Sequence, residues 1–126
     1  MKRVIKTQTA PGSVGAYSQA TTNGELVFTA GQVPETMDGD VLNDAPVEEQ
    51  TRQCLENLKG VLEAQDLTLR DVLKTTVYIV DIRNWERVNE AYSEYFDEEP
   101  PARSAVGVTG LWGGIDVEIQ AIAATD

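Results

Sequence analysis

Arg103, in the stretch Pro100-Pro101-Ala102-Arg103-Ser104-Ala105-Val106, is the residue with the clearest chemical potential in this chain. It is the only Arg or Lys between residues 88 and 126. A guanidinium presents a planar fork of donors that suits one carboxylate. The two prolines stop a preceding helix and keep the chain extended. An isolated Arg among 21 acidic residues is usually a surface ion pair, so its interpretation depends on the strand that it begins.

Histidine is absent and Cys54 is the single cysteine, which removes most nucleophilic and metal chemistry. A Cys–His nucleophile and a structural zinc site are both excluded. No glycine-rich phosphate-binding motif follows a strand. Any reaction must use carboxylates, Arg, Tyr, hydroxyls and backbone groups, and we expect neither metal nor cofactor. Cys54 lies on an apolar helical stripe, where core packing is the expected role.

The balance of 10 basic against 21 acidic residues, a net charge of −11, disfavours nucleic-acid binding. The acidic runs are scattered, as expected for a solvated surface in a salty cytoplasm. No apolar run reaches membrane length, the N-terminus lacks a signal-peptide core, and one cysteine suits a reducing compartment. We therefore expect a cytoplasmic protein with a single domain over residues 1–126.

The order of predicted elements is strand, hairpin, helix, strand, helix, hairpin. Residues 2–6 form a short strand, and residues 16–20 and 26–30 flank the turn Asn23-Gly24. Apolar spacing predicts a helix over 46–65 with Asp44 as N-cap. A β-branched strand follows over 74–80, and Asn84 begins a second helix whose Trp85, Val88, Tyr92 and Phe96 face the core. Strands over 103–108 and 115–123 end the chain. This order predicts an α+β domain with two helices on one face of a mixed sheet.

If the last two strands form a hairpin, alternation fixes which of their residues face the core. The core-facing positions are Val106, Val108, Ile115, Val117, Ile119 and Ala121. Arg103 and Glu118 then share the other face, about 7–8 Å apart when Ala105 lies opposite Glu118. That face mixes small, apolar and charged residues, which predicts a symmetric oligomer with sites between subunits. The residues alone leave two interpretations open: an interface ion pair of Arg103 with Glu118 or Asp116, or a small-anion site.

Several segments resemble the reactive intermediate deaminase family of the RidA/YjgF type, nearly end to end. Those near the two ends are Val14-Gly15-Ala16-Tyr17-Ser18-Gln19, Thr29-Ala30-Gly31-Gln32-Val33-Pro34, Pro101-Ala102-Arg103-Ser104 and Glu118-Ile119-Gln120-Ala121-Ile122-Ala123. Residues 72–78 and 88–92 resemble the middle of the family's sequence.

The resemblance implies a chorismate-mutase-like α+β fold, assembled as a homotrimer with sites in the clefts between subunits. It implies cofactor-independent hydrolysis of 2-aminoacrylate, 2-iminopropanoate and 2-iminobutanoate to 2-oxo acids and ammonia. Arg103 matches the position that holds the substrate carboxylate, Glu118 the acid beside the attacking water, and Tyr17 the tyrosine that closes the cleft. Gly31, Asn89 and the backbone of Ala105 match further substrate contacts.

Four departures from the family pattern bear on substrate preference more than on reaction class. Ala105 stands where many members carry Cys, Ala30 replaces a hydroxyl residue, and Ala16 replaces a frequent Pro before Tyr17. Trp112 lies in a loop that lacks the usual Pro and basic residue, where it would reshape the mouth of the cleft. Two other functions are weighed. A non-catalytic carboxylate sensor would need Arg103 but no working Glu118. Ribonuclease activity fits poorly with the net charge and the absence of His.

Overall fold

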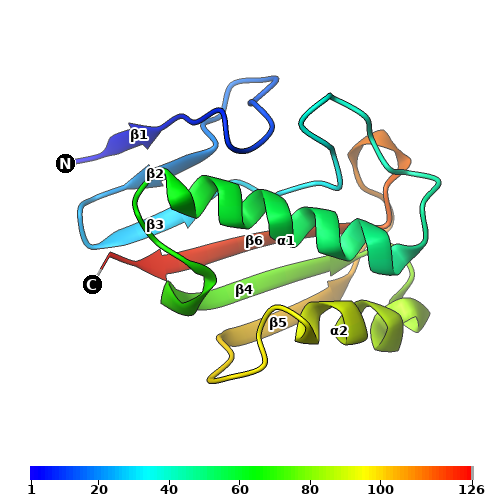
Figure 1. Cartoon of the computed structure of the whole chain (residues 1–126). Coiled ribbons are helices and arrows are strands. Elements are labelled where there is room, and N and C mark those ends of the chain that lie inside the picture. The colour runs from blue at the N-terminus through cyan, green and yellow to red at the C-terminus, as the bar shows by residue number, and fades with distance from the viewer. Residues whose placement is uncertain (126) are drawn as a thin grey trace.

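The computed structural model describes residues 1–125, which form one six-stranded sheet and two α-helices (Figure 1). The strands are β1 (Arg3–Ile5), β2 (Ala20–Thr22), β3 (Leu26–Thr29), β4 (Val72–Ile79), β5 (Ala102–Gly107) and β6 (Val117–Ala124). The helices are α1 (Val47–Glu63) and α2 (Trp85–Ser93), with short 3₁₀ turns η1 (Leu69–Asp71), η2 (Ile82–Asn84) and η3 (Trp112–Gly114). The strand order is β1-β2-β3-β6-β4-β5, and β4–β5 is the parallel pair. The predicted mixed α+β class is confirmed.

The β2–β3 hairpin forms around Asn23, whose side chain accepts hydrogen bonds from the backbone of Glu25 and Leu26. The expected strand over 16–20 is wrong, since β2 begins only at Ala20. The cause is Gln19, which is buried and bonds the backbone of Thr7 and of residues 10 and 11. These bonds hold residues 15–19 outside the sheet, as a loop.

Helix α1 carries the predicted apolar stripe, and every member of it is buried: Val47, Cys54, Leu55, Leu58, Val61 and Leu62. The predicted N-cap is wrong, because Pro46, extended at ψ 148°, occupies that position in place of Asp44. Asn84 stands at the N-cap of α2 but makes no side-chain capping bond. No helix within residues 1–125 has the length and apolar character needed to cross a membrane.

The last two strands do not form the predicted hairpin. Strand β5 pairs in parallel with β4, after α2 has crossed over between them. Strand β6 pairs with β3 on one side and β4 on the other, so it lies inside the sheet. The chain between β5 and β6, residues 108–116, passes β4 instead of turning tightly back. Phe96, expected on the second helix, lies beyond its end but is buried.

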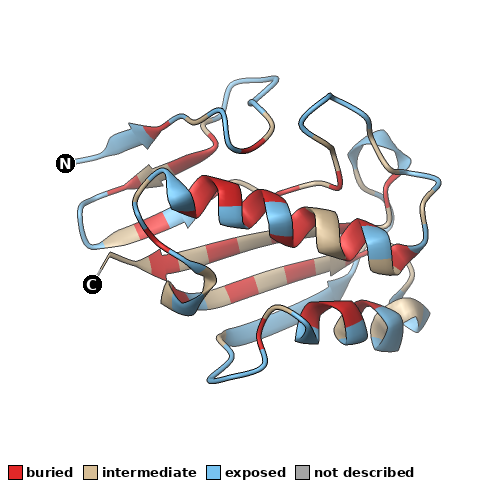
Figure 2. Cartoon of the chain, in the orientation of Figure 1, coloured by how far each residue is buried: buried red, intermediate tan, exposed pale blue. Residues whose placement is uncertain are grey.

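The two faces of the sheet differ in what covers them. The helix-covered face contains Val77, Ile79, Val117 and Ile119, all fully buried, and the burial colours alternate along β4 and β6 (Figure 2). The opposite face, here called the outer face, is not covered by either of the α-helices described within residues 1–125. The pairing puts Val4, Phe28 and Val106 there, and they are 60%, 43% and 39% exposed. Val106 therefore does not face the protomer's core, contrary to the sequence prediction.

Candidate active site

Glu118 lies on the outer face of β6, the central strand next to β4. Its neighbour across the pair is Tyr78, while Ile119 beside it points into the core. Gly31 lies against its carboxylate so closely that a Cβ at residue 31 would overlap the Glu118 oxygen. The bridge between Gln32 and Ile119 holds the two segments together through two backbone hydrogen bonds of 2.7 and 3.0 Å. Gly31 is therefore what leaves room for the acid.

The Glu118 carboxyl is half-buried, and this burial raises its pKa above the ordinary value of 4.5. Burial in a less polar medium disfavours the charged form, which makes the carboxylate a stronger proton acceptor once ionised. No cation within residues 1–125 forms an ion pair with it. A half-buried acid without a countercharge, in a pocket, is typical of a functional site.

A pocket of about 400 Å³ opens in front of Glu118 and Gly31. Tyr17 lines it and is 51% exposed, with its hydroxyl accepting a hydrogen bond of 3.3 Å from the backbone of Val14. Three of the residues predicted from the sequence, Tyr17, Gly31 and Glu118, are thus brought together on one side of the protomer.

Arg103 lies elsewhere, on β5 against helix α2. Its guanidinium carbon is 4.5 Å from the ring centre of Trp85 and 4.7 Å from that of Tyr92, and Nη1 donates to Asn89 Oδ1 at 2.9 Å. Cation–π contacts of this kind orient a guanidinium without neutralising it. Arg103 forms no ion pair within residues 1–125, so the alternative of a pair with Glu118 or Asp116 is not formed within the protomer.

Arg103 and Glu118 lie on opposite faces of the sheet, so the predicted arrangement on one face is wrong. Thr75 pairs with both Arg103 and Ala121, and paired side chains share a face. Ala121 is buried under the helices, and Glu118, three residues away, points the other way. Strand spacing and rise separate the two Cα atoms by roughly 14 Å. One protomer therefore presents two half-sites: Glu118 with Gly31 and Tyr17, and Arg103 with Asn89.

Ala105, the remaining predicted contact, follows Arg103 on the same face of β5. It is exposed and pairs with Val77 across the strand. Its backbone belongs to the edge strand that carries Arg103, and β4 lies between it and the strand of Glu118.

Comparison with known proteins identifies the family. The family model described as Endoribonuclease L-PSP matches residues 7–125. A RutC family protein of Pyrococcus horikoshii is 46% identical over 98% of both chains. The 2-iminobutanoate/2-iminopropanoate deaminase of Salmonella typhimurium is 40% identical, again over 98% of both. The crystal structure of Escherichia coli TdcF with bound serine superposes with a TM-score of 0.90 at 40% identity, covering 97% of this chain and 98% of that one. The chain belongs to the RidA/YjgF family of reactive intermediate deaminases.

In this RidA/YjgF family member, sequence reasoning missed the aromatic support of Arg103. Trp85 and Tyr92 were expected to be core residues; Tyr92 is buried, but Trp85 is only partly buried and both rings face the guanidinium. The sequence does contain a pattern that indicates this support. Trp85, Asn89 and Tyr92 are spaced four and three residues apart, which places them on one helix face. Glu35 was likewise not foreseen as lining the pocket of Glu118, whereas Trp112, expected at the mouth of the cleft, does line it.

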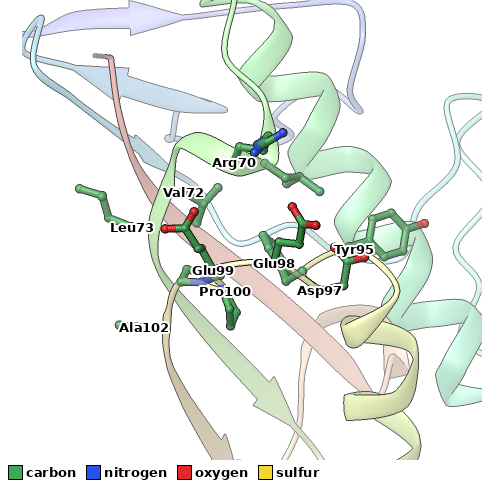
Figure 3. Close-up of a pocket in the computed structure, with 12 residues that line it drawn as sticks. Arg70, Val72, Leu73, Tyr95, Asp97, Glu98, Glu99, Pro100 and Ala102 are labelled. Carbon is green, nitrogen blue, oxygen red and sulfur yellow. The ribbon is translucent and has the colours of Figure 1, made fainter.

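A further pocket of about 490 Å³ lies near the start of β4 and β5 and contains neither Arg103 nor Glu118. Figure 3 shows Arg70 coming from η1 and Asp97, Glu98 and Glu99 from the loop before β5. These three acidic residues are exposed. Residues 1–125 contain no cluster of three or more potential metal-ligating side chains.

Proposed function

We propose that this protein hydrolyses reactive enamine and imine acids, namely 2-aminoacrylate, 2-iminopropanoate and 2-iminobutanoate, to 2-oxo acids and ammonia. The observation that carries the proposal is the Glu118 carboxylate, half-buried beside Gly31 and Tyr17 in a pocket, with no cation paired to it within residues 1–125. The name of the relative from Salmonella typhimurium supports the reaction class.

We propose further that the working unit is a homotrimer in which each site takes Arg103 from one protomer and Glu118 from its neighbour. The support is geometric: within a protomer the two residues are on opposite faces and cannot reach one small molecule. The outer face also exposes Val4, Phe28 and Val106, an apolar surface that a second copy would cover.

In the proposed reaction, Arg103 binds the substrate carboxylate through two N–H donors. Its stacking between Trp85 and Tyr92 fixes the plane of the fork before substrate arrives. This positions the imine carbon near a water molecule held by Glu118.

The chemistry then needs one base and a proton relay. Glu118 accepts a proton as the water oxygen attacks the carbon of the protonated imine and the C=N π electrons return to nitrogen, giving a neutral carbinolamine. That proton is passed to the carbinolamine nitrogen. The C–N bond then breaks as the hydroxyl gives its own proton to Glu118 and the C=O bond forms, so that ammonia leaves with the 2-oxo acid. The enamine 2-aminoacrylate enters by tautomerising to its imine. No cofactor is required, because the imine carbon is already electrophilic. Tyr17 covers the pocket and offers its hydroxyl as a donor.

The test couples this protein to a pyridoxal-phosphate dehydratase that releases the imine from serine or threonine. We expect faster 2-oxo acid release than the dehydratase gives alone. Glu118→Gln should keep carboxylate binding and lose turnover. Arg103→Lys should lose most of the activity, because a point charge cannot replace the planar fork. Loss of binding and turnover together in Glu118→Gln would make Glu118 a structural residue.

The competing function is a carboxylate sensor, which the serine bound to TdcF favours. Binding of serine or a 2-oxo acid without accelerated imine hydrolysis would support it over the deaminase. Ribonuclease activity, named in the family's description, is disfavoured by the net charge of −11. A nuclease activity of the pure protein that is lost in Arg103→Ala would contradict that expectation.

A further inference from the structure

Tyr92 connects the guanidinium of Arg103 to the core of the protomer. Its ring centre is 4.7 Å from the guanidinium carbon, yet the residue is only 3% exposed. The Tyr92 hydroxyl lies 2.7 Å from the hydroxyl of Thr75, which is fully buried, and the two form a hydrogen bond. Two hydroxyls that the proposed reaction does not use are therefore paired with each other in a part of the molecule closed to solvent.

Thr75, Tyr92 and Arg103 form a closed ring of contacts between two strands and a helix. Thr75 on β4 lies directly opposite Arg103 on β5, and their side chains share the face on which α2 lies next to β5 (Figure 1). Strand pairing fixes the Arg103 backbone, the hydroxyl bond fixes the Tyr92 ring, and the ring faces the guanidinium. All of these contacts lie within one protomer, so a copy that covers the outer face leaves them in place.

The stability of the core does not by itself require this pair of hydroxyls. Val77 and Ala121 lie beside Thr75, and the ring of Phe96 is centred 4.7 Å from that of Tyr92. In such surroundings a buried hydrogen-bonded pair contributes little more than two apolar groups of the same shape. What the bond adds is direction, because it restricts the tilt of a ring that packing alone would hold more loosely.

Burial also keeps the Tyr92 phenol neutral. It raises the pKa of Tyr92 above the ordinary value of 10.0, although the bond with Thr75 and the charge of Arg103 act in the opposite direction. A phenolate would pair with Arg103 and compete with a bound carboxylate. A neutral ring instead orients the guanidinium and leaves its charge available to a ligand.

We infer that Thr75 and Tyr92 are positioning residues, which act through Arg103 by fixing the plane of its guanidinium for the substrate carboxylate. A guanidinium free to tilt would meet the carboxylate with one donor instead of two, and the imine carbon would be misplaced. The inference rests on the proposed function in one respect, namely that Arg103 holds a carboxylate.

The test removes both hydroxyls and keeps the side-chain shapes, with Thr75→Val and Tyr92→Phe in one chain. Because neither hydroxyl is then left unpaired, the urea midpoint of unfolding should stay close to that of wild type. Calorimetry with 2-oxobutanoate, a product of the proposed reaction, should give a Kd about tenfold higher than that of wild type. For 2-iminobutanoate released by a threonine dehydratase, kcat/KM should fall by at least the same factor.

Two further variants separate positioning from a purely structural role. Thr75→Ser keeps the hydroxyl and deletes a buried methyl group, so it should lower the urea midpoint while Kd stays within about twofold of wild type. Thr51→Val is the matched control, because Thr51 is also fully buried and its hydroxyl donates to the Val47 carbonyl at 2.8 Å. The control should leave Kd unchanged.

A wild-type Kd in the double variant would overturn the inference, and so would a Kd in Thr75→Ser as high as that of the double variant. The proposed function fails separately. If wild type binds 2-oxobutanoate without accelerating imine hydrolysis, the deaminase is wrong, and the Kd series still decides the role of Thr75 and Tyr92. Accelerated hydrolysis that is equal in wild type and the double variant would refute the positioning pair alone. If wild type neither binds the acid nor hydrolyses the imine, both proposals fail.

Discussion

At the scale of single residues, the position of the Glu118 carboxylate depends on the missing side chain at residue 31. A methyl group there would overlap the carboxylate oxygen, which is the far end of a flexible side chain and can move aside. The fold should therefore tolerate Gly31→Ala while the acid is displaced. We expect near wild-type stability and a loss of imine hydrolysis about as large as that of Glu118→Gln.

A double-mutant cycle tests this coupling. If Gly31 acts only by leaving room for Glu118, Gly31→Ala combined with Glu118→Gln should be no slower than Glu118→Gln alone. If the losses of hydrolysis rate in the two single variants multiply in the double variant, residue 31 has a separate contact with substrate. Urea unfolding of each variant, at one protein concentration, checks that the protein remains folded.

At the scale of elements, helix α1 packs against the N-terminal segment at Gly60. A Cβ at this position would overlap the carbonyl of Thr9, whose hydroxyl donates to the Gly60 carbonyl at 2.6 Å. Alanine in a helix interior gains about 1 kcal/mol over glycine. Here the overlap involves backbone that cannot swing away, so Gly60→Ala should be destabilising overall, by about 1–3 kcal/mol.

The measurement is the urea midpoint of unfolding beside that of Gly110→Ala, a glycine with nothing within 4 Å of the added methyl. Gly110→Ala should leave the midpoint nearly unchanged. A Gly60→Ala variant more stable than wild type would mean that the N-terminal segment yields to the methyl and that helix propensity decides the outcome.

Most elements could be predicted from the sequence because their burial is local to the protomer. The apolar stripe of α1 and the β-branched run of β4 each face the helix–sheet core. The spacing of their apolar residues therefore indicates directly which side of each element is buried. The pairing of β5 and β6 could not be predicted in this way. Alternation fixes which residues share a face within one strand, but it does not identify the neighbouring strand.

At the scale of the molecule, Val106 shows why the predicted site geometry was wrong. Its apolar character was assigned to the protomer's own core, yet it lies on the outer face and is 39% exposed. In the proposed trimer that face is covered by another copy, so the pattern in β5 reflects assembly as well as folding. Arg103, three residues before it, consequently points to the helix side, away from Glu118.

If each site takes Arg103 from one protomer and Glu118 from its neighbour, two inactive variants should restore activity to each other, which they would not do if each site lay within one protomer. Arg103→Ala and Glu118→Gln should each be inactive as pure proteins, because every site lacks one half. In trimers assembled from equal amounts of both, a site works when Arg103 comes from the Glu118→Gln chain and Glu118 from the Arg103→Ala chain. Random mixing gives this in about a quarter of sites, so co-refolded protein should recover about a quarter of wild-type activity. In the control, a chain that carries both Arg103→Ala and Glu118→Gln is mixed with an equal amount of wild-type chain. The activity of this mixture, too, should be about a quarter of that of pure wild type. If both residues acted within one protomer, the first mixture would stay inactive and the second would keep about half.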